Sequence, residues 1–149
     1  MIKKIILIVI FFSLTSCGYQ SIYSVNKQSN YKNINQIKME GNKNLDRKII
    51  SLLNFNTKKN LIYNLKIISE KNNSIIAKDK AGNVSMYNFQ IKVEIYILKD
   101  QTIIKNKSFE ENFNYSKTGN NFDLLQYQNN IEANLIDKIT DKIIIFLNS

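Results

Sequence analysis

Residues 84–98 read VSMYNFQIKVEIYIL and carry the clearest strand pattern in the chain. Large apolar residues alternate with mostly polar ones along this stretch. The apolar series is Tyr87, Phe89, Ile91, Val93, Ile95 and Ile97, and the polar series is Asn88, Gln90, Lys92 and Glu94. Because successive side chains of a strand point to opposite faces, the stretch predicts a strand with one buried and one solvated face.

A second strand follows almost at once. Residues 99–101 are long enough only for a turn, and residues 102–115 then place Phe109, Phe113 and Tyr115 on one face. Two long strands joined by so short a turn predict an antiparallel hairpin.

Two further strands are expected before this hairpin. Residues 61–70 alternate, and a short continuation over residues 74–77 leads into a turn at residues 78–83. The inward face of this strand is expected to hold Leu61, Tyr63, Leu65 and Ile67. Residues 34–40 predict a short first strand with Ile37 and Met39 on one face, ended by the Gly41-Asn42 turn.

Two helices are expected around these strands. Asn44 is expected to cap a helix over residues 45–54, with Asp46 in its first turn and a stripe of Leu45, Ile49, Leu52 and Leu53. After a polar loop over residues 116–120, Asn120 or Asn121 with Asp123 starts a helix that reaches Asn148. Its apolar face is Leu124, Ile131, Leu135, Ile139 and Phe146, widened by Ile136, Ile143 and Leu147. The order β-α-β-β-β-α predicts a single α+β domain over residues 34–149, with two helices on one face of a mostly antiparallel sheet of about four strands.

The N-terminus has the pattern of an exported lipoprotein. Lys3 and Lys4 precede an apolar run of about ten residues, the length of a signal-peptide core and too short to span a bilayer. The run ends in Leu14-Thr15-Ser16-Cys17, which matches a lipobox and places the only cysteine where that motif requires it. We expect residues 1–16 to be a signal peptide and Cys17 to carry diacylglycerol and an N-acyl chain such as palmitate. The alternatives are an ordinary signal peptide with an incidental thiol and a short membrane anchor.

The residues after the lipobox indicate a location. Gly18, rather than an aspartate, follows Cys17, which favours sorting to the outer membrane, with the domain on its periplasmic face. Residues 17–33 are polar and aperiodic and are expected to form a flexible tether between the lipid and the domain.

The charge balance is basic. Removing residues 1–16 takes away two of the 21 basic residues and none of the 12 acidic ones, so the remainder carries a formal charge of 19 − 12 = +7. This suits an anionic partner such as a phosphorylated glycolipid. An AT-rich coding bias toward Ile, Lys and Asn would produce the same composition. A basic aromatic motif is absent, so no nucleic acid partner is expected.

The composition excludes several classes of catalytic site. The chain has no histidine and its one cysteine is assigned to lipid, which excludes His-based triads, Cys-His pairs and ordinary zinc sites. Glu110 and Glu111 point to opposite faces of a strand, and the glycines lie far apart: Gly18, Gly41, Gly82 and Gly119. A Ser-Lys dyad is left open. We expect no enzyme, no metal and no cofactor beyond the acyl chains.

The expected mature N-terminus, Cys17-Gly18-Tyr19-Gln20-Ser21-Ile22-Tyr23, resembles that of the LPS-assembly lipoproteins of the LptE type. In the most similar members the chain reads Cys-Gly-aromatic and, after one residue, Pro-Leu-Tyr, so Ser21 and Ile22 depart from the pattern. The order of elements is also similar. Such proteins have an aromatic strand, a loop and a long helix near the far end, and the matching residues here are Tyr115, Tyr127, Ala133, Leu135 and Ile139.

The resemblance implies a protein that plugs a large outer-membrane β-barrel, the LPS-assembly protein, helps it to fold and binds lipopolysaccharide. The face of Asn88, Gln90, Lys92 and Glu94 suits such a plug, although any solvated sheet face would look alike. Candidate contacts for lipopolysaccharide phosphates are Lys78, Lys80 and Lys92, which ordinary surface charge would also explain. Two other functions stay open: an auxiliary lipoprotein of an ABC-type lipid transporter, and a hydrolase using a Ser-Lys pair.

Overall fold

The computed structural model describes residues 33–117 and 120–149. In chain order the elements are β1 (Asn33–Ile34), β2 (Gln36–Gly41), α2 (Lys43–Leu53), β3 (Asn56–Thr57), β4 (Tyr63–Lys78), β5 (Val84–Lys99), β6 (Thr102–Ser116) and α3 (Asn121–Asn148). The expected signal peptide, Cys17 and nearly all of the expected tether lie outside the described residues.

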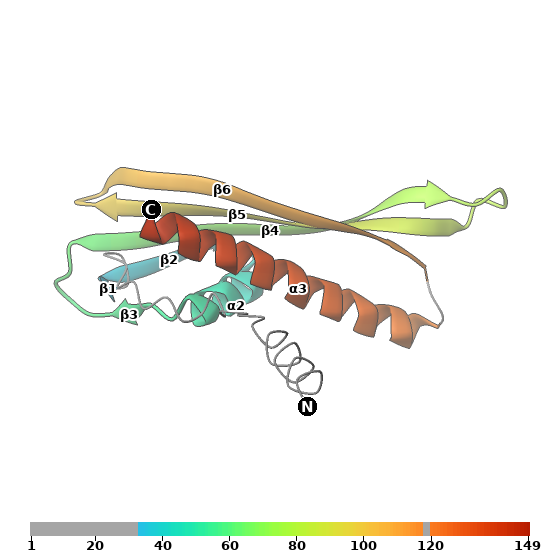
Figure 1. Cartoon of the computed structure of the whole chain (residues 1–149), viewed down its shortest axis with the longest axis horizontal. Coiled ribbons are helices and arrows are strands. Elements are labelled where there is room, and N and C mark those ends of the chain that lie inside the picture. The colour runs from blue at the N-terminus through green and yellow to red at the C-terminus, as the bar shows by residue number, and fades with distance from the viewer. Residues whose placement is uncertain (1–32, 118–119) are drawn as a thin grey trace, which may run out of the picture.

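The strands form a four-stranded sheet in the order β2-β4-β5-β6, and both helices lie on one side of it (Figure 1). β2 pairs with β4 in parallel, because α2 carries the chain back to the same end, whereas β4–β5 and β5–β6 are antiparallel hairpins. β1 and β3 form a separate two-stranded parallel sheet. The predicted α+β class, with two helices on a mostly antiparallel sheet, is confirmed.

The core lies between the sheet and the two helices. The inward side chains of β5 from Phe89 to Ile97 are buried, which confirms the predicted phase of this strand. From Ile131 onward, the predicted apolar face of α3 is buried against them, and Phe146 meets Phe109 edge to face with ring centroids 5.8 Å apart. Each fully buried aliphatic side chain contributes roughly 1.5–3 kcal/mol, so this layer accounts for most of the stabilisation of the domain.

β4 is one strand of 16 residues rather than the two shorter segments predicted. It pairs with β5 from Tyr63 opposite Lys99 to Lys78 opposite Val84, with register shifts between Ile75 and Lys78. The polar stretch in its middle has no strand pattern of its own and is held extended by the ladder to β5. Leu61 lies before the strand, so its predicted place on the inward face is wrong.

The predicted first strand is divided at Asn35. Its backbone N–H donates to the carbonyl of Tyr63 at 2.7 Å, whereas Ile34 pairs with β3. Met39 lies on the short edge strand β2 and is 37% exposed, while Ile37 packs against the core. Ile37 and Met39 were predicted to share one face of the strand, but only Ile37 is packed against the core.

The cap of α2 is Asn42, not Asn44 as predicted. Its side-chain oxygen accepts a hydrogen bond from the backbone N–H of Leu45 at 3.1 Å. The buried side of α2 is centred on Leu45, Asp46 and Ile49, so Leu52 at its margin is 49% exposed and does not belong to the buried stripe.

The start of α3 agrees with the prediction. The side-chain oxygen of Asn120 accepts hydrogen bonds from the N–H groups of Phe122 and Asp123 at 2.9 and 3.0 Å. The helix runs obliquely beneath the sheet, so its first turns lie farther from the strands than its last ones (Figure 1). Phe113 is therefore 42% exposed, although it is in phase with the buried Phe109 and Tyr115. Within the described ranges, no helix is both long and apolar enough to cross a membrane.

Candidate functional site

The outer face of the sheet is polar and is paired across strands. Asn88 donates to Asn114 at 2.6 Å, and Gln90 donates to Glu110 at 2.7 Å. On the same face the Lys92 ammonium lies 2.7 Å from the Glu94 carboxylate. The predicted polar face of β5 is thus extended across β6 by matched cross-strand partners.

Charges on this face largely neutralise one another. Glu40 on β2 contacts Lys38 and Lys66 at 2.8 and 2.7 Å, and these two lysines hold the pKa of Glu40 below its usual value. Lys92 and the Tyr96 hydroxyl likewise lower the pKa of Glu94. Both carboxylates therefore stay ionised at neutral pH, and the face is hydrophilic without a strong field of one sign.

The three lysines proposed from the sequence do not form one site. Lys92 lies in the middle of the polar face, and Glu94 is its partner. Lys78 ends β4 opposite Val84, and Lys80 lies in the hairpin turn. Lys92 lies eight positions along β5 from Val84, which corresponds to about 27 Å. A single phosphate cannot contact Lys92 and the hairpin lysines together.

The turn between β4 and β5 is ordered by Asp79. Its carboxylate accepts hydrogen bonds from the backbone N–H groups of Ala81 and Asn83 at 2.8 and 2.9 Å. Hydrogen bonds to Asn83 lower the pKa of Asp79. Lys78 and Lys80 are both exposed and belong to a turn of defined shape. The one carboxylate of this turn, that of Asp79, already accepts hydrogen bonds from the turn itself.

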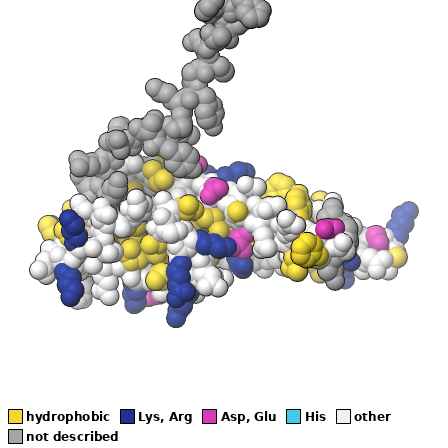
Figure 2. Space-filling view, turned by 90° about the horizontal axis from the view of Figure 1, so that it is seen from below, with side chains coloured by type: hydrophobic (Ala, Val, Ile, Leu, Met, Phe, Trp, Pro, Cys, Tyr) yellow, Lys and Arg dark blue, Asp and Glu magenta, His cyan; other side chains and the backbone are white. Residues whose placement is uncertain are grey.

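Seven of the 13 large exposed apolar side chains in the described residues lie toward the same end of the molecule. Figure 2 views the helix side and shows hydrophobic patches, one of them toward the end that carries the β4–β5 hairpin tip. The large exposed apolar residues from this region are Ile75, Ile76, Met86, Phe113, Phe122, Leu125 and Tyr127. An apolar surface beside lysines is what an amphiphilic ligand requires.

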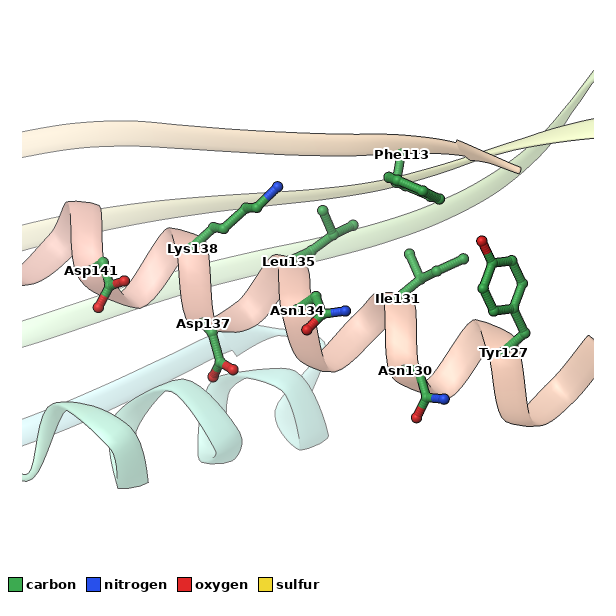
Figure 3. Close-up of a pocket in the computed structure, with 9 residues that line it drawn as sticks. All are labelled: Phe113, Tyr127, Asn130, Ile131, Asn134, Leu135, Asp137, Lys138 and Asp141. Carbon is green, nitrogen blue, oxygen red and sulfur yellow. The ribbon is translucent and has the colours of Figure 1, made fainter. Parts of the chain in front are cut away.

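A cleft of about 360 Å³ opens between β6 and α3. Phe113 of β6 and Tyr127 of α3 point toward one another at one end, and Ile131 and Leu135 form the apolar floor (Figure 3). The remaining lining residues form a polar lip along α3: Asn130, Asn134, Asp137, Lys138 and Asp141. This size lies at the lower end of the range for small-ligand pockets.

Tyr115 is a hydrogen-bonding centre that the sequence did not reveal. It stacks on Tyr87 with ring centroids 5.3 Å apart and meets Tyr127 edge to face at 5.9 Å. Its hydroxyl lies 2.8 Å from the side-chain nitrogen of Asn73 and 2.8 Å from that of Gln128. These contacts join β4, β5, β6 and α3 where the helix leaves the sheet. The phase of Tyr115 in its strand predicted burial but not these partners.

Glu132 joins the two helices to the sheet. It is almost fully buried and contacts Lys48 of α2 at 2.6 Å and Lys71 of β4 at 2.7 Å. Burial alone would raise the pKa of Glu132, but these two lysines outweigh burial and hold it below its usual value. The cluster ties α2 and β4 to α3.

Asp46 is a buried carboxyl group in the first turn of α2. Neither of its oxygens has a hydrogen-bond partner among the described residues, because the nearby Ser69 hydroxyl donates to the carbonyl of Asn42 at 3.3 Å. Burial raises the pKa of Asp46 above its usual value. The ionised form therefore reduces the stability of the fold.

We expect Asp46→Asn to stabilise the domain at pH 7.5 by about 1 kcal/mol, because the neutral amide avoids a buried charge. Because the pKa of Asp46 is raised in the folded state, the protonated side chain stabilises the fold fully below about pH 3.9. This stabilisation is lost as the pH rises through the folded-state pKa. The gain should thus shrink toward pH 4 in denaturant melts. Asp79→Asn is the control. Because the pKa of Asp79 is lowered, this change should destabilise the domain at pH 7.5 rather than stabilise it. A gain for Asp46→Asn that is equal at pH 4 and pH 7.5 would contradict this assignment.

In the part of the chain that the structure describes, no group of three or more acidic, histidine or cysteine side chains lies together. Glu110 and Glu111 lie on opposite faces, as predicted: Glu110 accepts from Gln90 on the outer face, and Glu111 pairs with Lys142 of α3. The expectation that the chain is not an enzyme stays a prediction.

Comparison with solved structures shows a shared fold. No protein-family model and no curated protein matches the chain. The minor lipoprotein of Acinetobacter baumannii superposes with a TM-score of 0.61 at 12% identity, covering 79% of this chain and 91% of its own. Rare lipoprotein B of Shewanella oneidensis gives 0.52 at 17% identity, covering 74% and 94%. Lipoprotein B of Nitrosomonas europaea gives 0.55 at 6% identity, covering 76% and 83%. The chain thus has a fold found in bacterial lipoproteins.

Proposed function

We propose that this chain is an outer-membrane lipoprotein, held by acyl chains on Cys17, that assists the assembly of a large β-barrel, plugs its lumen and binds lipopolysaccharide on its way to the cell surface. The observation that carries the proposal is the polar sheet face, in which paired side chains cover β5 and β6 over a closed apolar core. The lumen of a large outer-membrane barrel is polar and wet, so a plug needs such a surface. The lipobox and the fold shared with bacterial lipoproteins support the same function.

The hairpin end is the part we assign to lipopolysaccharide. Lys78 and Lys80 supply cations for phosphate groups, and the exposed Ile75, Ile76 and Met86 on the same hairpin supply apolar contact for acyl chains. Lys92 is a weaker candidate, because Glu94 already neutralises it.

Depletion of the chain in cells should lower the amount of correctly assembled barrel and weaken the outer-membrane permeability barrier. The tagged full-length chain should also co-purify with a very large outer-membrane protein after mild detergent extraction and resist protease in that complex, because a plug is contacted over much of its surface. Cys17→Ser serves as a control for the anchor and should incorporate no labelled fatty acid. Crosslinking in cells that captures only inner-membrane transporter proteins, with barrel levels unchanged on depletion, would favour an auxiliary lipoprotein of an ABC-type transporter instead.

Lipopolysaccharide binding should depend on the hairpin lysines. We expect the double variant Lys78→Gln and Lys80→Gln to bind purified lipopolysaccharide several-fold more weakly, since each charge near an anionic surface is worth about 1 kcal/mol. The matched control is Lys58→Gln with Lys59→Gln, a second pair of exposed neighbouring lysines far from the hairpin. Equal loss in both pairs would indicate general charge attraction and remove the hairpin as a site.

A further inference from the structure

β6 forms one edge of the sheet. It is hydrogen-bonded to β5 on one side, and among the described strands none pairs with its other side over the 15 residues from Thr102 to Ser116. Such an edge presents a row of unpaired backbone groups to any extended segment of matching length. Its length is well above that of an average strand.

The flank of α3 beneath this edge carries exposed apolar side chains. Phe113 and Tyr127 at the mouth of the cleft are each about two-fifths exposed, and Ile145, on the same side of the helix as Lys138 and Lys142, is 62% exposed. A partner chain whose strand pairs with β6 would cover these side chains with residues of its own. The edge and the flank therefore form one continuous surface, which we call the β6 flank.

The charges of the β6 flank match those of a second β6 flank. On the strand, Lys105 and Lys107 come first and Glu110 and Glu111 follow. In an antiparallel pair of identical strands the basic half of one meets the acidic half of the other. In the second half of α3 the sequence adds the acids Asp137 and Asp141 and the bases Lys138 and Lys142. The flank thus holds four bases and four acids, in a chain with a formal charge of +9.

We propose that a second copy of this chain occupies the β6 flank, with the two β6 strands antiparallel about a twofold axis at Phe109. In this register Lys107 faces Glu111 of the second copy, and Asn106 faces Asn112. Within the described part of its own chain, the Lys107 ammonium contacts the aromatic rings of Phe109 and Phe146, with centroids 5.6 and 5.8 Å away, and no carboxylate. The two four-stranded sheets become one sheet with all helices on the same side. The proposal goes beyond the proposed function and depends neither on a barrel nor on lipopolysaccharide.

Disulfide trapping in cells tests the pairing. Two differently tagged full-length copies, one with Asn106→Cys and one with Asn112→Cys, are co-expressed and oxidised with copper phenanthroline. Opposite residues of antiparallel strands have Cα atoms about 4.5–5.5 Å apart, within the range that a disulfide spans. A mixed disulfide carrying both tags is expected. Cells with two unsubstituted tagged copies report any disulfide formed through Cys17.

Two controls make the result specific. Each cysteine variant expressed alone should crosslink at least several-fold less, because in this register neither position faces itself. Adding Ser108→Glu, which sets a carboxylate opposite Glu110 of the second copy, should lower the mixed disulfide by about tenfold. Asn72→Glu, on the same sheet face but on β4, should leave it unchanged. Absence of the mixed disulfide, equal yields in the single variants, or an equal effect of the two glutamates would overturn the proposal.

Discussion

Ile91→Asp is expected to unfold the domain, whereas Lys92→Asp should leave the domain folded and only slightly less stable. Ile91 is 0% exposed at the centre of the layer between β5 and the helices, so the aspartate would lose the apolar burial and place an unpaired charge in the core. The combined cost exceeds about 5 kcal/mol, a large part of the stability of a domain of this size. Lys92 on the other face loses only its pair with Glu94 and gains repulsion from Glu70 and Glu110.

Circular dichroism and thermal melts of the two variants measure this difference. Ile91→Asp should show no cooperative transition at 25 °C and above, while Lys92→Asp should keep the wild-type spectrum and melt a few degrees lower. A similar loss of melting temperature in both variants would show that β5 does not present these two residues to opposite faces.

Gly41→Ala is expected to destabilise the domain by about 3–5 kcal/mol. Gly41 ends β2 with φ of +103°, and a Cβ there would lie 2.4 Å from the carbonyl oxygen of Ser69 in the paired strand β4. Because that oxygen belongs to the backbone of a central strand and accepts a hydrogen bond from Asn42, it cannot move aside without breaking the ladder.

Gly82→Ala separates the steric clash from backbone strain. Gly82 also has a positive φ, of +86°, but a Cβ there would meet nothing within 4 Å. Its expected cost is therefore only the strain of about 1–2 kcal/mol. Urea unfolding of both variants at the same pH gives the two free energies. If Gly82→Ala costs as much as Gly41→Ala, the close approach of β2 and β4 at Ser69 does not determine the requirement for glycine.

The candidate surfaces were predictable to different degrees. The polar face of β5 followed from alternation alone, and its cross-strand partners Asn114 and Glu110 then lie where antiparallel pairing puts them. The lysines at positions 78, 80 and 92 were chosen for charge without positions in space, so their separation became visible only once the β4–β5 register was known. Asp46 was expected as a favourable first-turn residue of α2, and its burial without a partner was not foreseen.

The sequence by itself determined which residues share a face and where α3 begins. These properties depend on neighbours a few positions apart: the period of two in residues 84–98, and the asparagine cap at Asn120. Only the tertiary structure decided the length of β4, the exposure of Leu52 and Phe113, and the partners of Tyr115 and Glu132. Each of these depends on contacts between distant segments, such as Lys48 with Glu132 at a separation of 84 residues and Asn73 with Tyr115 at 42. Local periodicity carries no information about such pairs, because the packing of whole elements brings them together.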